Sequence, residues 1–258
     1  MRLIVTRPRA QAEPLVAELQ LAGLDAAALP LIDIAPLRDP LPLQRAWQAL
    51  PQLALLMFVS ANAVQHFMRH RPPHATWPAQ VLAGSTGPGT STALRQAGVP
   101  PQALVEPAGT VFDSEALWQR LHERDWSGRH VLVVRGESGR DWLAERFGQA
   151  GARVEFVAAY ERRLPRLDAP AQALLDAAQR CPLQHLWLLS SSEGVANLAL
   201  LAPGADWSSA TAFAPHERIV AAARQLGFGR VDAVAADAAA VARAVSALAQ
   251  RSIQSGPP

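Results

Sequence analysis

Short apolar runs alternate with amphipathic stretches along most of the chain. Leu3–Val5, Leu55–Val59, Val131–Val134 and Leu186–Leu189 are such runs, and each leads into a segment whose apolar residues recur at helical spacing. Parallel strands in βα units are buried on both faces, so they read as continuous apolar runs. The pattern therefore predicts an α/β fold built on parallel sheets.

The same order of elements occurs twice, at an offset of about 130 residues. Each copy has an opening strand and helix, a second strand that enters a helix through a polar turn, a third turn with its helix, and a closing helix. The matching pieces are Leu3–Pro8 and Val131–Gly136, Leu55–Asn62 and Leu186–Ser192, Gly87–Thr90 and Ala214–Glu217, and Ser114–Leu121 and Ala238–Leu248. This self-similarity predicts an internal tandem duplication, and 258 residues suffice for two compact domains.

In each copy the opening piece is followed by an extended segment that reaches a proline. These segments are Leu31–Pro36 and Phe156–Pro165. A terminal proline suits a strand that stops or lies at the edge of a sheet. We expect both segments to cross between the two domains.

Composition removes several function classes. All 24 basic residues are arginine, which excludes a Schiff-base lysine, a pyridoxal-phosphate lysine and a Walker-type lysine. Cys181 is the single cysteine, so an intramolecular disulfide and a thiolate zinc site are excluded, and a reducing compartment fits.

Charge and hydropathy argue against nucleic acid and membrane partners. The net charge is +2 and the arginines are scattered rather than clustered. The N-terminus reads as a strand and a helix instead of a signal peptide, and no apolar run approaches the roughly 18 residues of a membrane span. We expect a cytoplasmic protein.

Polar residues cluster where the predicted strands enter helices. In open parallel sheets, ligands bind outside the carboxyl ends of the strands, where free helix N–H groups favour anions. Each turn alone is better explained by helix capping, but together the turns predict a cleft for carboxylate or phosphate groups, with Arg7 and Arg135 as bidentate clamps. The turns are Thr6-Arg7-Pro8, Ser60-Ala61-Asn62, Thr86-Gly87-Pro88-Gly89-Thr90, Arg135-Gly136-Glu137-Ser138-Gly139, Ser190-Ser191-Ser192 and Pro215-His216-Glu217.

The sequence gives little support for nucleotide binding, for a serine nucleophile or for a metal site. The glycines of Gly84–Gly89 do not match a dinucleotide fingerprint, and no Gly-x-Ser-x-Gly elbow surrounds Ser60 or Ser190. The histidines lack metal-ligand spacing, so we expect no metal. His66 and His70, four residues apart, are assigned to a solvated helix face.

Tyr160 is the only tyrosine and lies on the second crossing segment. A phenol facing a cleft between domains could donate or position a proton. The alternative is an aromatic side chain that packs across the two crossing strands with its hydroxyl on water. The sequence leaves both interpretations open.

These motifs together carry a resemblance that spans nearly the whole chain. The segments Val5–Pro8, Phe58–Val64, Gly87–Thr90 and Val134–Gly136, with the strand of Tyr160, follow the order and spacing of the uroporphyrinogen-III synthase family, which the chain resembles. The resemblance implies two doubly wound parallel-sheet domains joined by a two-stranded β-ladder. Residues 1–35 and 166–258 would form one domain, residues 38–158 an inserted domain, and segments near 31–40 and 156–165 the linker.

The resemblance also implies an activity without a cofactor. Hydroxymethylbilane, a linear tetrapyrrole with eight carboxylates, would be closed to uroporphyrinogen III with loss of water and inversion of ring D through a spiro intermediate. Tyr160 would assist the departure of hydroxide. The substrate would bind at the turns, largely through backbone N–H groups, at Arg7, Ser60, Ala61, Asn62, Thr86, Gly87, Gly89, Thr90, Arg135, Gly136, Ser190, Ser191, Ser192 and His216.

The last of these turns departs from the family pattern. Many members have a Gly-Pro-x-Thr run where this chain has Ala214-Pro215-His216-Glu217, which leaves open whether His216 replaces the threonine. The resemblance further implies a monomer that takes its substrate in a transient hand-over from hydroxymethylbilane synthase. The alternative from another class is a non-enzymatic two-domain protein that binds an anionic small molecule in the same cleft.

Overall fold

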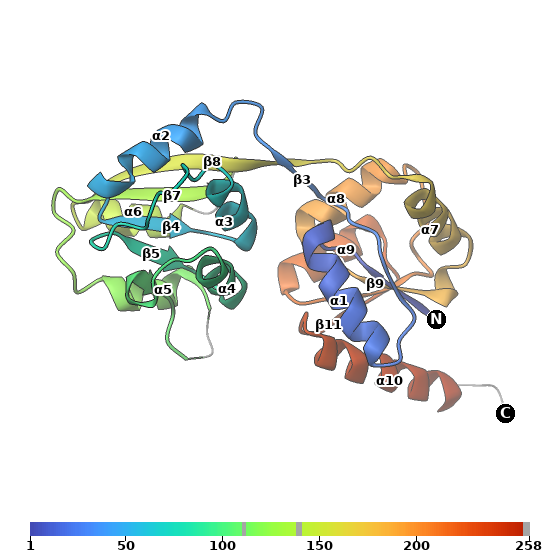
Figure 1. Cartoon of the computed structure of the whole chain (residues 1–258). Coiled ribbons are helices and arrows are strands. Elements are labelled where there is room, and N and C mark those ends of the chain that lie inside the picture. Colours follow the sequence, from blue (N-terminus) through green and yellow to red (C-terminus); the bar gives the residue numbers. More distant parts are fainter. Residues whose placement is uncertain (110–111, 138–140, 255–258) are drawn as a thin grey trace. The chain divides into compact units, whose positions relative to one another are not determined.

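A computed structural model describes residues 1–109, 112–137 and 141–254 of the chain, without the side chains of residues 249 and 251–254 (Figure 1). The described part divides into two compact units. Unit 1 comprises Met1–Asp33 with Arg163–Pro258, and unit 2 comprises Ile34–Arg162. Both are α/β units, which confirms the fold class predicted from the alternating pattern.

In the described residues, unit 1 has a five-stranded sheet in the order β11-β10-β9-β1-β2, and its recorded strand pairs are parallel. The strands are β1 (Arg2–Val5), β2 (Ala26–Ala28), β9 (His185–Leu188), β10 (Thr211–Ala214) and β11 (Arg230–Ala233). The helices are α1 (Arg9–Leu21), α7 (Ala169–Arg180), α8 (Ser192–Leu201), α9 (Glu217–Leu226) and α10 (Ala238–Gln254), with the 3-10 helix η3 (Pro182–Gln184).

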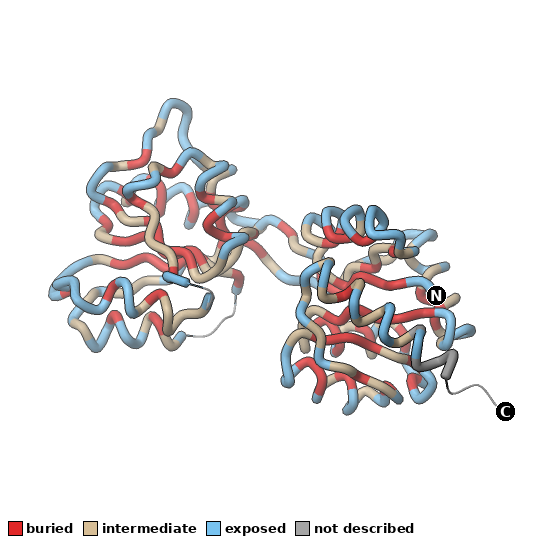
Figure 2. Tube along the Cα trace, turned by 90° about the horizontal axis from the view of Figure 1, so that it is seen from below, coloured by how far each residue is buried: buried red, intermediate tan, exposed pale blue. Residues whose placement is uncertain are grey.

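Alternating side chains of β1 point into two apolar cores, one on each face of this sheet. Ile4 packs with residues of α7, α8 and α9. Leu3 and Val5 pack with residues of α1 and α10. The sheet of unit 1 is therefore wound on both faces, and its buried residues follow the strands (Figure 2).

The sheet of unit 2 has, in the described residues, six strands in the order β3-β8-β7-β4-β5-β6. The strands are β3 (Asp33–Pro36), β4 (Leu55–Phe58), β5 (Leu82–Ser85), β6 (Leu104–Val105), β7 (His130–Gly136) and β8 (Arg153–Arg163). The helices are α2 (Leu41–Ala49), α3 (Ala61–Met68), α4 (Pro88–Gln96), α5 (Ser114–Leu121) and α6 (Trp142–Gln149), with the 3-10 helices η1 (Leu50–Gln52) and η2 (Pro101–Ala103).

This second sheet is also covered on both faces. Leu56 and Phe58 of β4 pack with α2, α3 and α4, whereas Leu55 and Met57 pack with α5 and α6. The segments predicted to cross between domains include β3 and most of β8, which begins three residues earlier than expected, and these two strands are neighbours in this sheet.

The duplication is visible in how the strands are distributed. Each sheet combines the first two strands of one copy with the last three of the other, so the order β2-β1-β9-β10-β11 in unit 1 matches β8-β7-β4-β5-β6 in unit 2, where β3 is added at the edge beside β8. The equivalent helices α1 and α6 end alike, since Gly23 and Gly151 follow them with φ of 82° and 86°. A residue in this left-handed region ends a helix, and glycine adopts it without strain.

Candidate active site

Each unit has one point where the winding of the sheet changes face. In unit 1 it lies between β1, whose connection α1 covers one face, and β9, whose connection α8 covers the other. In unit 2 it lies between β7 and β4, followed by α6 and α3. Ligands of doubly wound proteins bind outside the carboxyl ends of the strands at such points.

The turns after β1 and β9 meet in unit 1. Thr6 is buried, and its hydroxyl donates a hydrogen bond to the carbonyl oxygen of Leu188 (2.8 Å). Its Oγ1 also lies 3.5 Å from the hydroxyl of Ser190, at the end of the neighbouring strand. Two turns that are far apart in the sequence are thereby held side by side.

Arg7 is anchored inside the same unit. Its Nη2 donates to the carbonyl oxygen of Ala236, in the connection between β11 and α10, at 2.6 Å. Burial lowers the pKa of Arg7, and Glu18 opposes this shift. The guanidinium predicted as a clamp therefore already has one protein acceptor.

Two serines occupy equivalent N-caps in the two units. Ser60 caps α3 by accepting from the N–H of Ala63 (3.1 Å), and Ser191 caps α8 by accepting from Gly194 (2.9 Å). Their backbones agree, with φ and ψ of −162° and 160° at Ser60 and −159° and 153° at Ser191. Capping is thus the observed local role of both side chains.

The neighbouring residues of these two turns differ in burial. Ala61 is partly exposed, whereas Asn62 is buried in the first turn of α3. In unit 1, Ser192 begins α8 and its hydroxyl donates to the carbonyl oxygen of Arg218 at 3.4 Å.

The next pair of turns is also equivalent. Gly87 is the N-cap of α4 and His216 that of α9, and both have an extended backbone. The His216 side chain is exposed and does not cap its helix. Gly89 is exposed in the first turn of α4, and Thr90 is buried there.

A chain of hydroxyls that sequence reasoning missed supports the turn before α4. The hydroxyl of Ser91 donates to that of Ser85 (2.9 Å), which donates to the carbonyl oxygen of Gly87 (2.9 Å). Both serines are almost fully buried. The signal in the sequence is a serine on the last position of an apolar strand, where a buried hydroxyl requires a partner.

Tyr160 lies in the core of unit 2. Its side chain is 1% exposed and belongs to the apolar cluster beneath α2, α3 and α4. Its hydroxyl lies 3.3 Å from Oγ of Ser60. Its ring lies against Gly136, where an added Cβ would be 3.1 Å from Cε2. The structure thus brings together three predicted site residues: Tyr160, Ser60 and Gly136.

His66 is part of the same cluster, so its assignment to a solvated helix face is wrong. The residue is 6% exposed, and its ring lies 5.7 Å from that of Tyr160, between centroids. Burial lowers the pKa of His66, and the charges of Arg69 and His70 lower it further. The buried positions Ala63 and Phe67 on α3 are three residues before it and one after it, which places position 66 on the inner face.

Arg135 is engaged by two groups of its own unit. It forms an ion pair with Asp141, just before α6, and its Cζ lies 4.1 Å from the ring centroid of Phe156 on β8. The guanidinium that the sequence predicts as a clamp for substrate carboxylates therefore already contacts two groups of the protein. Ser138 and Gly139 of the same predicted turn lie outside the described residues.

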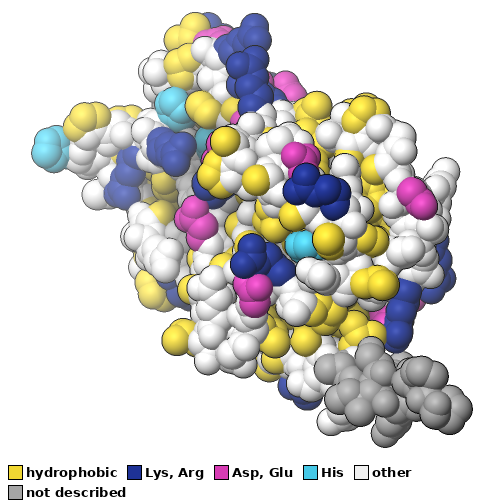
Figure 3. All heavy atoms as spheres, turned by 90° about the vertical axis from the view of Figure 1, so that its right-hand side faces the viewer, with side chains coloured by type: hydrophobic (Ala, Val, Ile, Leu, Met, Phe, Trp, Pro, Cys, Tyr) yellow, Lys and Arg dark blue, Asp and Glu magenta, His cyan; other side chains and the backbone are white. Residues whose placement is uncertain are grey.

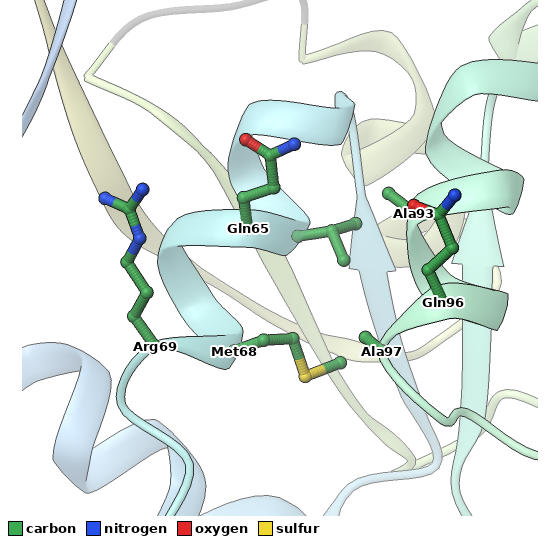
Figure 4. A pocket seen from close by; sticks show the side chains of 7 residues that line it. Gln65, Met68, Arg69, Ala93, Gln96 and Ala97 are labelled. Atoms are coloured by element: carbon green, nitrogen blue, oxygen red, sulfur yellow. The ribbon is translucent and has the colours of Figure 1, made fainter. Parts of the chain in front are cut away.

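A hollow of about 200 Å³ opens beside Arg135, at the carboxyl ends of the strands on the α5 and α6 face. Thr86, Ser114 and Phe156 also line it. A shallower groove of about 400 Å³ lies between α3 and α4, where Met68 points toward α4 and Arg69 away from it (Figure 4). The groove contains none of the predicted site residues.

Neither a cluster of metal ligands among the described residues nor, on the face drawn in Figure 3, a patch of charges of one sign is found. Among the described residues, no three His, Cys, Asp or Glu side chains converge as a metal site. Basic and acidic side chains are interspersed on the face in Figure 3. In the same part of the chain, no helix is long and apolar enough to span a membrane.

Fold and site together define a doubly wound α/β protein of two units, in which paired turns stand at the point where each sheet changes face. A family model described as uroporphyrinogen-III synthase HemD matches residues 13–242. The chain belongs to the uroporphyrinogen-III synthase family, whose members are lyases of porphyrin biosynthesis.

Individual relatives agree with this assignment. A uroporphyrinogen-III synthase of Synechococcus elongatus is 30% identical over 220 residues, covering 80% of this chain and 78% of the relative. One of Chlorobaculum parvum is 28% identical over 172 residues, covering 64% of this chain and 65% of the relative. A crystal structure of a mutant uroporphyrinogen III synthase from Thermus thermophilus shares the fold, with a TM-score of 0.60 at 18% identity over 97% of this chain and 99% of that one.

Proposed function

We propose that this chain closes hydroxymethylbilane to uroporphyrinogen III, with loss of water and inversion of ring D through a spiro intermediate. The observation that carries the proposal is the set of four equivalent turns, with N-caps at Ser60, Gly87, Ser191 and His216. Each has an extended N-cap followed by a helix of at least eight residues. The first-turn N–H groups and the helix dipole of such a turn suit the carboxylates that this substrate carries.

The proposed contribution of the protein is mainly orientation. The bilane is activated enough to lose hydroxide and to cyclise unaided to the wrong isomer. Holding the chain so that ring A attacks the substituted carbon of ring D therefore decides the product. This chemistry requires no cofactor, and the backbone at the turns carries most of the binding.

Side chains have specific parts in the proposal. Arg7 and Arg135 pair with substrate carboxylates, and Tyr160 supplies a proton to the departing hydroxide. The neighbouring turn residues align the acetate and propionate groups. They are Ala61, Asn62, Thr86, Gly89, Thr90, Gly136, Ser190 and Ser192.

The cellular setting is part of the same proposal. The chain acts as a cytoplasmic monomer and receives its unstable substrate from hydroxymethylbilane synthase in a transient hand-over.

The domain organisation is also part of the proposal. The two domains, residues 1–35 with 166–258 and residues 38–158, are joined by the strands near 31–40 and 156–165.

The deciding experiment generates hydroxymethylbilane in situ and separates the uroporphyrin isomers after oxidation. Isomer III in excess of the spontaneous isomer I is expected. Isomer I at the uncatalysed rate, together with saturable binding of the bilane, would instead support the alternative of a non-enzymatic binding protein.

A further inference from the structure

The hydroxyl of Tyr160 is buried and lies next to a residue that is partly exposed. Its side chain is 1% exposed, whereas Ser60, whose Oγ lies 3.3 Å from the phenol oxygen, is partly exposed at the entrance to α3. A group that leaves from the turn side of the sheet therefore meets Ser60 before it meets the phenol.

The hydrogen bonds around Ser60 allow a proton to move from the phenol outward, because either hydroxyl of the Ser60–Tyr160 pair can be the donor. Oγ already accepts from the N–H of Ala63, which holds one lone pair of the hydroxyl. When Tyr160 donates to the second lone pair, the hydroxyl proton of Ser60 is left for a third group. This arrangement orders the protons from the phenol to the serine and outward.

We propose that Ser60 is the catalytic residue that hands a proton to the departing hydroxide, and that Tyr160 resupplies this proton from behind. The inference rests on the proposed function and refines the path of its proton. It makes Ser60 more than a helix cap and Tyr160 a donor that never touches the leaving group.

The step balances without a further reactant. The bond between the hydroxymethyl carbon and its oxygen breaks with the electron pair on oxygen, and the Ser60 proton completes a water molecule. Ser60 takes the phenol proton, which leaves Tyr160 as a phenolate. Attack of ring A then forms a carbon–carbon bond at the substituted carbon of ring D, and the bond from that carbon to its former bridging carbon breaks. The bridging carbon rebinds at the free α carbon of ring D, and the proton lost there returns through Ser60 to Tyr160.

One basic side chain of β8 lies near the ring of Tyr160. Cζ of Arg162 lies 6.0 Å from the centroid of the Tyr160 ring.

The duplication provides an internal comparison. Ser191 is the equivalent N-cap in unit 1, but Tyr160 is the only tyrosine of the chain, so a serine–phenol pair exists in unit 2 alone. Two helix caps of the same geometry thus differ in chemistry, which assigns proton transfer to one side of the duplicated set.

A double-mutant cycle tests the relay. Ser60→Ala and Tyr160→Phe should each lower kcat about 10-fold to 100-fold at little-changed KM, because backbone N–H groups carry the binding. If the two donors act in series, removing either one stops the relay. The double variant should therefore be no slower than the slower single variant. Multiplying effects, or a Ser60→Ala enzyme with wild-type kcat, would overturn the proposal.

Two further variants separate proton transfer from capping. Ser60→Asn keeps a good N-cap but has no hydroxyl, and Ser60→Thr keeps both. We expect low kcat for Ser60→Asn and recovered kcat for Ser60→Thr. Wild-type kcat in Ser60→Asn would show that capping alone is required.

Stability measurements complete the design. Asp113→Ala removes another N-cap of unit 2, that of α5, and gives the unfolding cost of a lost cap for comparison with Ser60→Ala. The wild-type isomer assay keeps the two proposals apart. Wild-type production of isomer III with an additive cycle rejects the relay alone, and isomer I from the wild type rejects the activity itself.

Discussion

Gly136 on β7 provides the space in which the ring of Tyr160 on β8 lies. A Cβ at position 136 would stand 3.1 Å from both Cε2 and Cζ of the ring. The two residues are register partners after an irregularity between Arg135 and Gly136. The glycine is thus required by a neighbouring side chain, besides any role of its N–H group.

Gly136→Ala should displace the Tyr160 ring and separate its hydroxyl from Ser60. Overpacking of a tight core site typically costs about 1–3 kcal/mol. We expect a free energy of unfolding lower by about that amount, measured by urea denaturation, with a parallel loss of kcat. In the control Gly148→Ala, at an exposed position of α6, no atom lies within 4 Å of the added Cβ and alanine favours the helix, so stability should not decrease. Equal destabilisation by both changes would contradict the proposed need for space.

Asp141 should compete with the substrate for Arg135. The Asp141 side chain is half exposed and does not cap α6, so Asp141→Asn should cost less than about 1 kcal/mol of stability. Without the ion pair, Arg135 is available to a substrate carboxylate. KM should therefore fall about two-fold to five-fold, which corresponds to the free energy of an exposed ion pair. Arg135→Gln should raise KM. Steady-state kinetics check both, and a higher KM in Asp141→Asn would show that the pair positions Arg135 for binding.

Arg7 should matter for stability as well as binding. Its hydrogen bond to the carbonyl oxygen of Ala236 ties the turn after β1 to the connection before α10. Arg7→Met should lower the free energy of unfolding by about 1.5–3 kcal/mol, the usual range for a hydrogen bond to a charged group. Arg7→Lys keeps the charge and should recover part of the loss. An unchanged unfolding curve for Arg7→Met would show that the bond contributes nothing net.

The buried imidazole of His66 should make stability depend on pH. Its folded pKa is lowered by burial from an ordinary value of 6.5, so the folded state favours the neutral ring. As the pH falls below about 6.5, the unfolded chain binds a proton that the folded chain does not, and the free energy of unfolding decreases. The decrease levels off below the folded pKa, and no effect is expected above neutral pH.

His66→Gln should remove this part of the pH dependence. Urea denaturation of both proteins between pH 5 and 8 gives the free energy of unfolding of the wild type minus that of His66→Gln. This difference should decrease as the pH falls. Since the other titrating groups are shared, the difference isolates His66. Parallel curves would exclude a lowered folded pKa.

Local patterns were enough to predict the elements around the site. The helix expected at Ser114–Leu121 has those bounds, and the four matched turns lead into α3, α4, α8 and α9. A strand, a polar turn and a helix are determined by neighbouring residues, so apolar runs and capping residues identify them.

Contacts across the sheet were beyond the sequence alone. Ser60 and Tyr160 are one hundred positions apart and meet because β7 stands between β4 and β8. The burial of His66 and the contact of Arg135 with the ring of Phe156 on β8 depend on the same packing. The residue types indicated which side chains could take part in chemistry. The order of the strands determined which of these side chains already contact other groups of the protein.

The exchange of strands between the two copies has a consequence for biosynthesis. β1 lies between β2 and β9, with Arg2 paired to His185, whereas unit 2 is complete at Arg162. A ribosome therefore finishes the second unit while β1 and β2, which precede it in the chain, still lack their partner β9. The apolar faces of β1 and β2 stay uncovered during that interval, so this segment can associate wrongly until the rest of unit 1 has been made.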